Sequence, residues 1–177
     1  MSIQQVQDKQ KITPCLWFEK NNAEEAMNFY IEVFNSSPAK KSESKIVSIQ
    51  RYPEGGEGPI AGMDGKVLTG IFELNGQSFM CLDGGPLWSF SGAISFQIEC
   101  ENQAELDHYW SKMSADPSAE QCGWIKDKYG LSWQIIPREM EALLTDPDKE
   151  KSGRAFKAMM EMKKIDLAAL KKAFDGQ

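Results

Sequence analysis

Residues 122–137 read CGWIKDKYGLSWQIIP, and this stretch decides the fold that the sequence predicts. Two short apolar runs, 123–126 and 131–137, flank a polar turn that begins at Asp127. In the second run, large apolar side chains occupy every second position from Leu131, which is the period-two pattern of a strand with two different faces. The stretch is therefore predicted to be a β-hairpin that closes a sheet.

The hairpin has an earlier counterpart, which indicates an internal repeat. The segments ITPCLWFEKNNAEEAMNFY, from residue 12, and AISFQIECENQAELDHYW, from residue 93, both read as a strand followed by a capped amphipathic helix. The segment LNGQSFMCLDGG, from residue 74, matches KYGLSWQIIP, from residue 128, as a glycine followed by an alternating strand. Within the first repeat, apolar and polar side chains alternate over residues 44–52 and 67–74, which predicts two more strands. Asn75-Gly76, directly after the second of these, is a strong hairpin signal.

The repeat predicts an α+β chain with four parts. These are a flexible N-terminus at 1–11, a βαβββ module at 12–86, a second βαβββ module at 87–137 and a helical extension at 138–177. Together they are expected to form one structural domain. The extension is predicted to be amphipathic, with Asp166 capping its last helix, and to pack against the modules or a second subunit.

Composition excludes several classes of function. The chain has 177 residues, 41% hydrophobic residues and a net charge of −6, which argues against a nucleic-acid or anionic-membrane surface. No stretch approaches the ~18 apolar residues of a membrane-spanning helix, and the N-terminus does not resemble a signal peptide. The 4 cysteines form no C-x-x-C pair, so buried thiols are expected rather than a zinc or redox motif. A cytoplasmic location is expected.

Together these motifs resemble the PhnB-like branch of the vicinal oxygen chelate (VOC) superfamily, historically labelled 3-demethylubiquinone-9 3-methyltransferase. The superfamily includes glyoxalase I, extradiol dioxygenases and bleomycin-resistance proteins. The resemblance spans about residues 11–170 and rests on ITPCLWF, the NFY-x-x-VF helix, NGQSFMCLDGGP, AISFQIEC and the 122–137 stretch. It implies that the two modules form a cupped, barrel-like mixed sheet with helices outside. It also implies a homodimer whose cup holds a metal or a small ligand.

The resemblance also implies metal-ligand positions, which carry over to Thr13, Met80, Ala93 and Gln134. None of these is a good ligand for a hard divalent metal, which needs histidine nitrogen or carboxylate oxygen. The single histidine, His108, is expected in the middle of a helix. We therefore predict no metal and no cofactor in the cup.

The strand faces that point into the expected cup supply candidate ligand-binding residues. They are aromatic or polar at alternate positions and comprise Thr13, Cys15, Trp17, Met80, Ser95, Gln97, Glu99, Ser132 and Gln134. Such a surface suits a small-molecule ligand. A purely structural role stays open for Trp17 as a core side chain and for Gln97 and Gln134 as bridges between strands. Trp88, on the connector between modules, is expected to cover the cup or to lie at a dimer contact.

Three functional hypotheses follow, and the sequence does not decide whether the protein is catalytic. The first is metal-independent binding of a small molecule in the cup. The second is an enzyme, either glyoxalase- or dioxygenase-like or a lyase or isomerase that uses Glu73 or Glu99 as a general base. The third is a bleomycin-resistance-like protein that sequesters a drug. The Gly-rich segment at 54–66 carries no phosphate-binding motif, so methyl transfer is not indicated.

Overall fold

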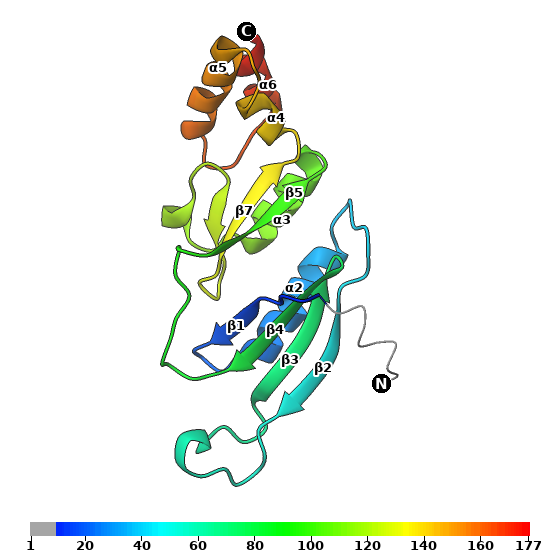
Figure 1. The fold of residues 1–177 in the computed structure, drawn as a ribbon, viewed down its shortest axis with the longest axis vertical. Helices are drawn as coiled ribbons and strands as arrows, with labels where there is room; N and C mark the ends of the chain where they lie inside the picture. Colours follow the sequence, from blue (N-terminus) through cyan, green and yellow to red (C-terminus); the bar gives the residue numbers. More distant parts are fainter. Residues whose placement is uncertain (1–9) are drawn as a thin grey trace. The chain divides into compact units, whose positions relative to one another are not determined.

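The computed structural model describes residues 10–177, an α+β chain that divides into two compact units (Figure 1). The first unit contains the described residues up to Ser36 together with Lys40–Ser89, and the second contains Ser37–Ala39 and Phe90–Gln177. Each unit has its own mixed sheet, with four strands in the first and three in the second. The predicted α+β class is confirmed. The flexible stretch predicted at 1–11 lies mostly outside the described residues.

The first unit has the predicted βαβββ order. Its elements are β1 (Cys15–Phe18), α2 (Ala23–Asn35), β2 (Lys45–Arg51), the short 3₁₀ turn η1 (Gly58–Ile60), β3 (Val67–Leu74) and β4 (Gln77–Asp83). The spatial order is β1-β4-β3-β2, with β1 parallel to β4 and the other neighbours antiparallel. The β3–β4 turn has positive φ at Asn75 (48°) and Gly76 (92°), as the Asn-Gly pair predicts.

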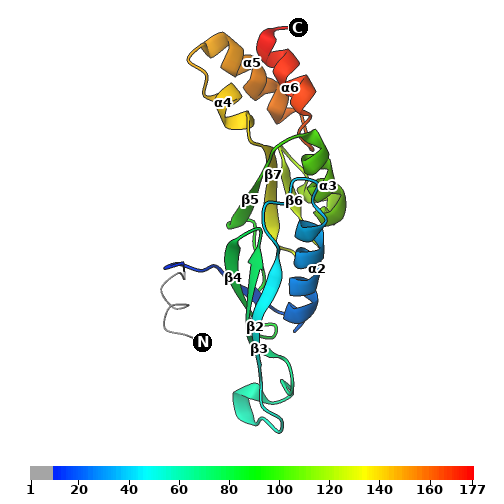
Figure 2. The ribbon, with the colours of Figure 1, turned by 90° about the vertical axis from the view of Figure 1, so that its right-hand side faces the viewer.

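Helix α2 covers one face of the first sheet (Figure 2). Its buried side chains recur at three- and four-residue spacing, as in an amphipathic helix, and are Ala23, Ala26, Met27, Tyr30, Val33 and Phe34. Beneath them, Phe72 and Phe79 stack with ring centroids 5.4 Å apart. The helix packs closely on β3 at Gly70, which has no side chain to separate them. A Cβ added at Gly70 would lie 2.8 Å from Cys81 Sγ and 2.9 Å from Met27 Sδ.

The second unit repeats this plan with one strand fewer. Its elements are β5 (Ser95–Cys100), α3 (Gln103–Met113), the 3₁₀ turn η2 (Pro117–Ala119), β6 (Trp124–Lys126), β7 (Ser132–Pro137), α4 (Met140–Leu144), α5 (Lys149–Met160) and α6 (Leu167–Asp175). The order is β5-β7-β6, with β5 parallel to β7. Where the first unit has β2, the second has η2 and an isolated bridge between Gln121 and Trp124. Pro117 lacks an N–H, and Asp116 accepts a hydrogen bond from Ser118 N, so this segment turns instead of extending.

The turn of the 122–137 stretch is built around Asp127, whose residue is only 3% exposed. Its Oδ1 accepts hydrogen bonds from the main-chain N–H groups of Tyr129 (2.9 Å) and Leu131 (3.0 Å). Its Oδ2 accepts one from Nε1 of Trp133 at 2.8 Å. A buried carboxylate is tolerated only with such donors. Asp127 therefore fixes both the β6–β7 hairpin and the orientation of Trp133, which is buried against α3.

Main-chain hydrogen bonds attach the C-terminal extension to the second unit. The N–H groups of Cys122 and Gly123 donate to the carbonyls of Met162 and Lys163, both at 2.8 Å. Ile165, in the same segment, is 0% exposed. Figure 2 shows α4, α5 and α6 gathered beyond the strands of this unit. Of the two packing sites predicted for the extension, the structure shows the one against the modules.

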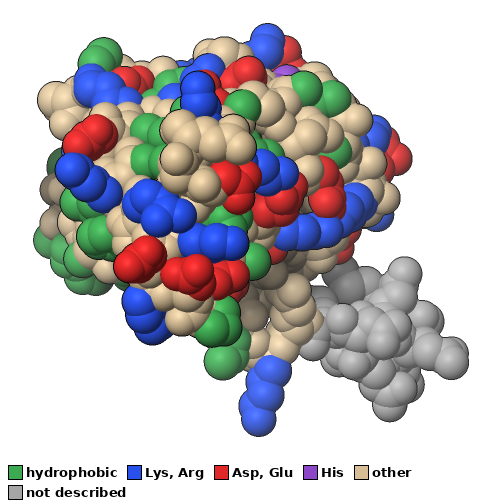
Figure 3. All heavy atoms as spheres, turned by 90° about the horizontal axis from the view of Figure 1, so that it is seen from above, with side chains coloured by type: hydrophobic (Ala, Val, Ile, Leu, Met, Phe, Trp, Pro, Cys, Tyr) green, Lys and Arg blue, Asp and Glu red, His purple; other side chains and the backbone are tan. Residues whose placement is uncertain are grey.

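The described residues contain no helix that is long and apolar enough to cross a membrane. On the face drawn in Figure 3, basic and acidic side chains are interspersed, so its described residues carry no continuous basic stripe. Elsewhere among the described residues, oppositely charged side chains also pair, as in Lys164–Asp107 (2.6 Å) and Lys171–Glu139 (2.6 Å). A nucleic-acid-binding face would need clustered positive charge.

Candidate functional site

The face of the first sheet that points away from α2 carries the first group of predicted site residues. This face, the first open face, includes Cys15, Trp17, Ile71, Met80 and Leu82, and the strand register pairs Cys15 with Met80. Cys15 is exposed and Trp17 and Met80 are half-buried. The alternate residues Leu16 and Phe18 are 4% and 2% exposed, beneath the helix. Thr13 precedes β1 and is exposed, so the structure does not place it on a strand.

Trp17 is held in one position on the first open face. Its Nε1 donates to the carbonyl of Gly85 at 2.9 Å, and its ring meets the Trp88 ring edge-on at 4.6 Å between centroids. A Cβ added at Gly84 would lie 2.1 Å from the Trp17 ring, so only glycine fits there. Trp88 is 61% exposed. The connector residue predicted to cover the cup or a dimer contact therefore covers part of Trp17 within the first unit.

The second sheet has an equivalent face with a more polar character. This second open face consists of Ser95, Gln97, Glu99, Trp124, Ser132, Gln134 and Ile136, and the register pairs Ser95 with Ser132 and Gln97 with Gln134. Gln134 Nε2 donates to Ser95 Oγ at 2.9 Å, and Gln97 Nε2 donates to Glu99 Oε1 at 3.3 Å. Ser132 is only 4% exposed, whereas Gln97 and Glu99 are exposed. The structure thus brings five predicted site residues onto one face.

A pocket of about 400 Å³ lies where the second open face meets α4. The sheet contributes Gln97, Glu99 and Ile136, and the following segment contributes Arg138, Met140, Glu141, Leu144 and Thr145. The sequence analysis missed the residues from α4. Their signal was the apolar pair Met140 and Leu144 at helical spacing directly after β7, which places both side chains on one helix face.

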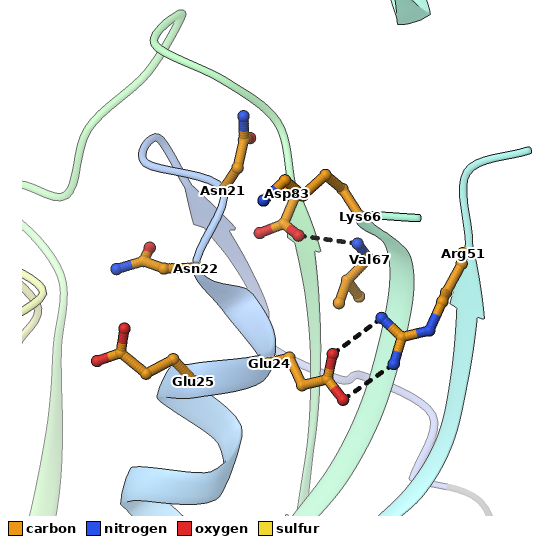
Figure 4. Close-up of a pocket in the computed structure, with 8 residues that line it drawn as sticks. All are labelled: Asn21, Asn22, Glu24, Glu25, Arg51, Lys66, Val67 and Asp83. Carbon is orange, nitrogen blue, oxygen red and sulfur yellow. Dashed lines mark hydrogen bonds and ion pairs between the residues drawn. The ribbon is translucent and has the colours of Figure 1, made fainter. Parts of the chain in front are cut away.

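A smaller hollow of about 230 Å³ lies at the start of α2 (Figure 4). Figure 4 shows Glu24 directed toward Arg51, with N–O distances of 2.8 and 2.9 Å between the two groups. The hydrogen bond from Arg51 lowers the pKa of the Glu24 carboxyl, against a smaller opposing effect of burial. The Glu24 carboxylate and the Arg51 guanidinium therefore pair with each other at this hollow.

Asp83 provides the helix cap in the same hollow. It is 2% exposed, and its two oxygens accept hydrogen bonds from Ala23 N and Val67 N, both at 2.8 Å. The side chains of Asn21 and Asn22, which directly precede α2, do not provide this cap. Asn22 is the N-cap residue but its side chain makes no cap hydrogen bond, and the Asn21 side chain accepts from Gly85 N. We interpret this hollow as structural, because its buried Asp83 joins the start of α2 to the start of β3.

The four positions that the sequence resemblance implied for metal ligands do not suit a hard divalent metal. Thr13 and Ala93 are exposed, Met80 offers only a thioether, and the Gln134 amide already donates to Ser95. Hard divalent ions need carboxylate or histidine donors. Within residues 10–177, no three His, Cys, Asp or Glu side chains converge on a common point. His108 is half-buried on α3, with its ring 5.3 Å from that of Tyr109.

Burial disfavours the reactive thiolate form of three cysteines, Cys15, Cys81 and Cys100. Burial raises the pKa of the Cys81 thiol to about 12 and also raises the pKa values of Cys15 and Cys100. A reactive thiol needs a lowered pKa. Cys122 is half-buried, and its Sγ lies 3.8 Å from the sulfur of Met160 in the extension.

The two carboxylates proposed as general bases also lack the environment such a role requires. Glu99 is exposed, and Glu73 lies 3.8 Å from the ammonium of Lys45. A base that works near neutral pH needs burial or another feature that disfavours its charge. Neither residue has that burial.

A family model described as 3-demethylubiquinone-9 3-methyltransferase matches residues 10–136. A solved PhnB protein from Bacillus cereus that carries the same family name is 40% identical, with a TM-score of 0.56, and covers 72% of this chain and 99% of its own. The chain belongs to this PhnB-like family. The family match ends at Ile136, so α4, α5 and α6 of this PhnB-like protein lie beyond it.

A second similar structure extends the likeness of the fold. The protein PA1353 from Pseudomonas aeruginosa is 17% identical, with a TM-score of 0.51, and covers 73% of the PhnB-like chain and 97% of its own. At this identity the likeness concerns the fold alone. No curated protein matches the sequence significantly.

Proposed function

We propose that this PhnB-like protein binds a small molecule on the open faces of its sheets, without a divalent metal. The observation that carries this proposal is the pocket of about 400 Å³ beside Gln97 and Glu99 on the second open face. Its volume falls within the range of roughly 300–1,000 Å³ for ligand pockets. The VOC-like cup, a homodimer and a cytoplasmic location complete the proposal.

The residues of the second open face can both orient and bury a ligand. Gln97 and Gln134 each carry donors and an acceptor on one side chain, so they can hydrogen-bond either kind of polar group. Ile136, Met140 and Leu144 line the pocket together with Gln97 and supply its apolar surface. Each CH₂ group of a ligand buried there is worth about 0.8 kcal/mol. Cys15, Trp17, Met80, Ser95 and Ser132 are proposed to contribute from the remaining strand positions, and Thr13 from the segment before β1.

The observations favour binding over catalysis. The enzyme hypothesis needs a buried base or an activated nucleophile. Glu99 is exposed, Glu73 lies beside Lys45, and burial raises the pKa values of the Cys15, Cys81 and Cys100 thiols. Methyl transfer, which the family name suggests, is not proposed, because the Gly-rich segment is a hairpin loop that leads into β3 and not into a helix. Drug sequestration of the bleomycin-resistance type is a special case of binding, and the net charge of −6 would favour a cationic drug.

A ligand screen by thermal shift, followed by calorimetry of the hits, tests the proposal. We expect compounds that stabilise the protein, with affinity lowered about three- to tenfold by Gln97→Ala or Gln134→Ala, the cost of roughly one hydrogen bond. Gln77→Ala is the matched control, because Gln77 is exposed on β4 and pairs with Gln10. Absence of any hit, or unchanged affinity in both variants, would contradict the proposal.

Metal analysis of the purified protein provides an independent check. We expect no stoichiometric zinc, nickel, manganese or iron, because the donor set at Thr13, Met80, Ala93 and Gln134 suits none of them. A stoichiometric metal that is lost in Gln134→Ala would overturn the metal-independent part of the proposal.

A further inference from the structure

We propose that the pocket between α4 and the second open face selects a small amphipathic cation, such as an alkylammonium ion. This inference rests on the proposed small-molecule function and names the class of ligand. It assigns a binding role to the helical extension, which lies outside the family match.

The extension builds one wall of the pocket and is held there firmly. Met140, Glu141 and Leu144 belong to α4, which begins three residues after β7 ends. Between α5 and α6, the main-chain bonds from Cys122 and Gly123 hold residues 162 and 163 against the strands of the second unit. Gln103 adds two side-chain bonds, donating to Ile165 O at 3.1 Å and accepting from Leu167 N at 2.9 Å. Because α4 follows β7 directly and the segment between α5 and α6 is attached to the same unit, the pocket wall is preformed.

The charges that line the pocket favour a cation. Glu99 and Glu141 both line it and both are exposed. The Glu141 carboxylate makes no hydrogen bond or ion pair within the described part of the chain, and Glu99 accepts only a 3.3 Å bond from Gln97. The one cation of the lining, Arg138, is paired with Glu101 at 2.8 Å between Nη2 and Oε1. Two carboxylates without a cationic partner therefore remain for a ligand.

The apolar part of the pocket lining favours a ligand that also has an apolar portion. Ile136 is 7% exposed, and Met140 and Leu144 are half-buried, so together they present an apolar surface beside the carboxylates. Methionine adapts its shape to different apolar partners. An ammonium group joined to a short alkyl chain matches both features, because its charge faces Glu99 or Glu141 while its chain covers the apolar side chains.

Calorimetry with three ligands of one length separates charge from apolar contact. The probes are hexylammonium, 1-hexanol and hexanoate, titrated into the full-length protein at low salt. We expect hexylammonium to bind about tenfold more tightly than 1-hexanol and hexanoate to bind most weakly, with the preference reduced at high salt. Equal affinities for hexylammonium and 1-hexanol would overturn the inference and leave the proposed function standing. Absence of binding by all three probes, together with an empty ligand screen, would contradict both.

Substitutions then test which carboxylates interact with the ammonium group. Glu99→Gln and Glu141→Gln each keep the shape of the side chain, and we expect each to weaken hexylammonium about three- to tenfold while leaving 1-hexanol unchanged. Glu161→Gln is the matched control, since Glu161 is an exposed carboxylate at the end of α5 and does not line the pocket. If Glu161→Gln weakens hexylammonium as much as the two pocket variants do, the cation binds through the overall negative charge and the inference is wrong.

Discussion

The two sheets share a parallel outer pair of strands but attach their helices in different ways. In the first sheet Phe18 pairs with Asp83, and Asp83 caps α2 from a distant part of the chain. In the second sheet the corresponding pair is Cys100 with Pro137, and proline has no side-chain acceptor to offer. Helix α3 is capped instead by its own Asn102, which accepts from Glu105 N at 3.1 Å.

The chain also continues differently after the two strands. Asp83 at the end of β4 caps α2, and the chain then leaves toward the connector at Gly84. After β7 the chain continues through Arg138, whose N–H bonds to Cys100 O at 2.9 Å, into α4, which forms one wall of the pocket. The two repeats thus share their parallel strand pairs, but the end of β4 caps α2 whereas the end of β7 leads into α4.

The largest effect is expected at the long-range cap. Asp83→Ala leaves the buried N–H groups of Ala23 and Val67 without their acceptor, at roughly 1–3 kcal/mol each. We expect the free energy of unfolding to fall by about 4 kcal/mol, measured by urea denaturation. Asp175→Ala, which removes an exposed carboxylate, should change it by less than about 0.5 kcal/mol. Similar values for the two variants would show that Asp83 is not the cap that joins α2 to the sheet.

The next effect concerns the attachment of the extension. Ile165→Ala removes a fully buried side chain, and we expect a loss of about 3 kcal/mol. Amide exchange at Cys122 and Gly123 should accelerate, because their N–H groups bond to the segment that holds Ile165. Ile12→Ala, at a position 84% exposed, serves as the control. If the Cys122 and Gly123 amides keep their protection in Ile165→Ala, the extension is attached by other contacts.

The local cap of the second sheet should matter less than the long-range cap of the first. We expect Asn102→Ala to cost about 1 kcal/mol, the usual value for loss of an N-cap side chain. Asn22→Ala is a matched control, because Asn22 holds the same position at α2 without a cap hydrogen bond, and it should cost close to nothing. A larger loss in Asn22→Ala than in Asn102→Ala would reverse the assignment of the two caps.

The smallest effect is a pH dependence in the second unit. The hydrogen bond from Lys164, at 2.6 Å, and the one from Gln103 lower the pKa of Asp107 below its ordinary value of 3.8, against a weaker effect of burial. The lowered pKa means that the contribution is present above pH 3.8 and is lost as the pH falls through the lower folded value. Because both side chains are over 40% exposed, we expect less than about 1 kcal/mol.

Unfolding measured between pH 6 and pH 2.5 checks this prediction against Asp107→Asn. The wild type should lose slightly more stability on acidification than the variant does. Parallel curves for the two proteins would show that the Lys164–Asp107 pair contributes nothing to the attachment of the extension.

The sequence predicted those features that depend on neighbouring residues. Period-two alternation predicted β3 over residues 67–74, and the structure has Val67–Leu74. The Asn75-Gly76 pair predicted the hairpin, and Asp166 was correctly predicted to cap the last helix, where it accepts from Ala169 N. These signals are local, so they can be recognised without knowledge of the tertiary structure.

Features that depend on distant parts of the chain could not be predicted in this way. The cap by Asp83 joins residues 60 positions apart, and no pattern near Ala23 indicates it. The pocket at α4 depends on the direction that the chain takes after β7. The alternation of β5 and β7 did indicate that Ser95, Gln97, Glu99 and Gln134 share a face. It did not indicate that Ser132, on the same face, would be buried.

The side-chain amide signals of Gln97 and Gln134 provide the most direct test of the proposal that the second open face binds a small molecule. Both NH₂ groups lie on that face and can be followed in a nitrogen–proton NMR spectrum during titration with hexylammonium. The account predicts saturable shifts of these signals and of the α4 main-chain amides, with the Gln77 side chain unaffected. Shifts confined to other surfaces, with Gln97 and Gln134 unchanged at saturation, would contradict it.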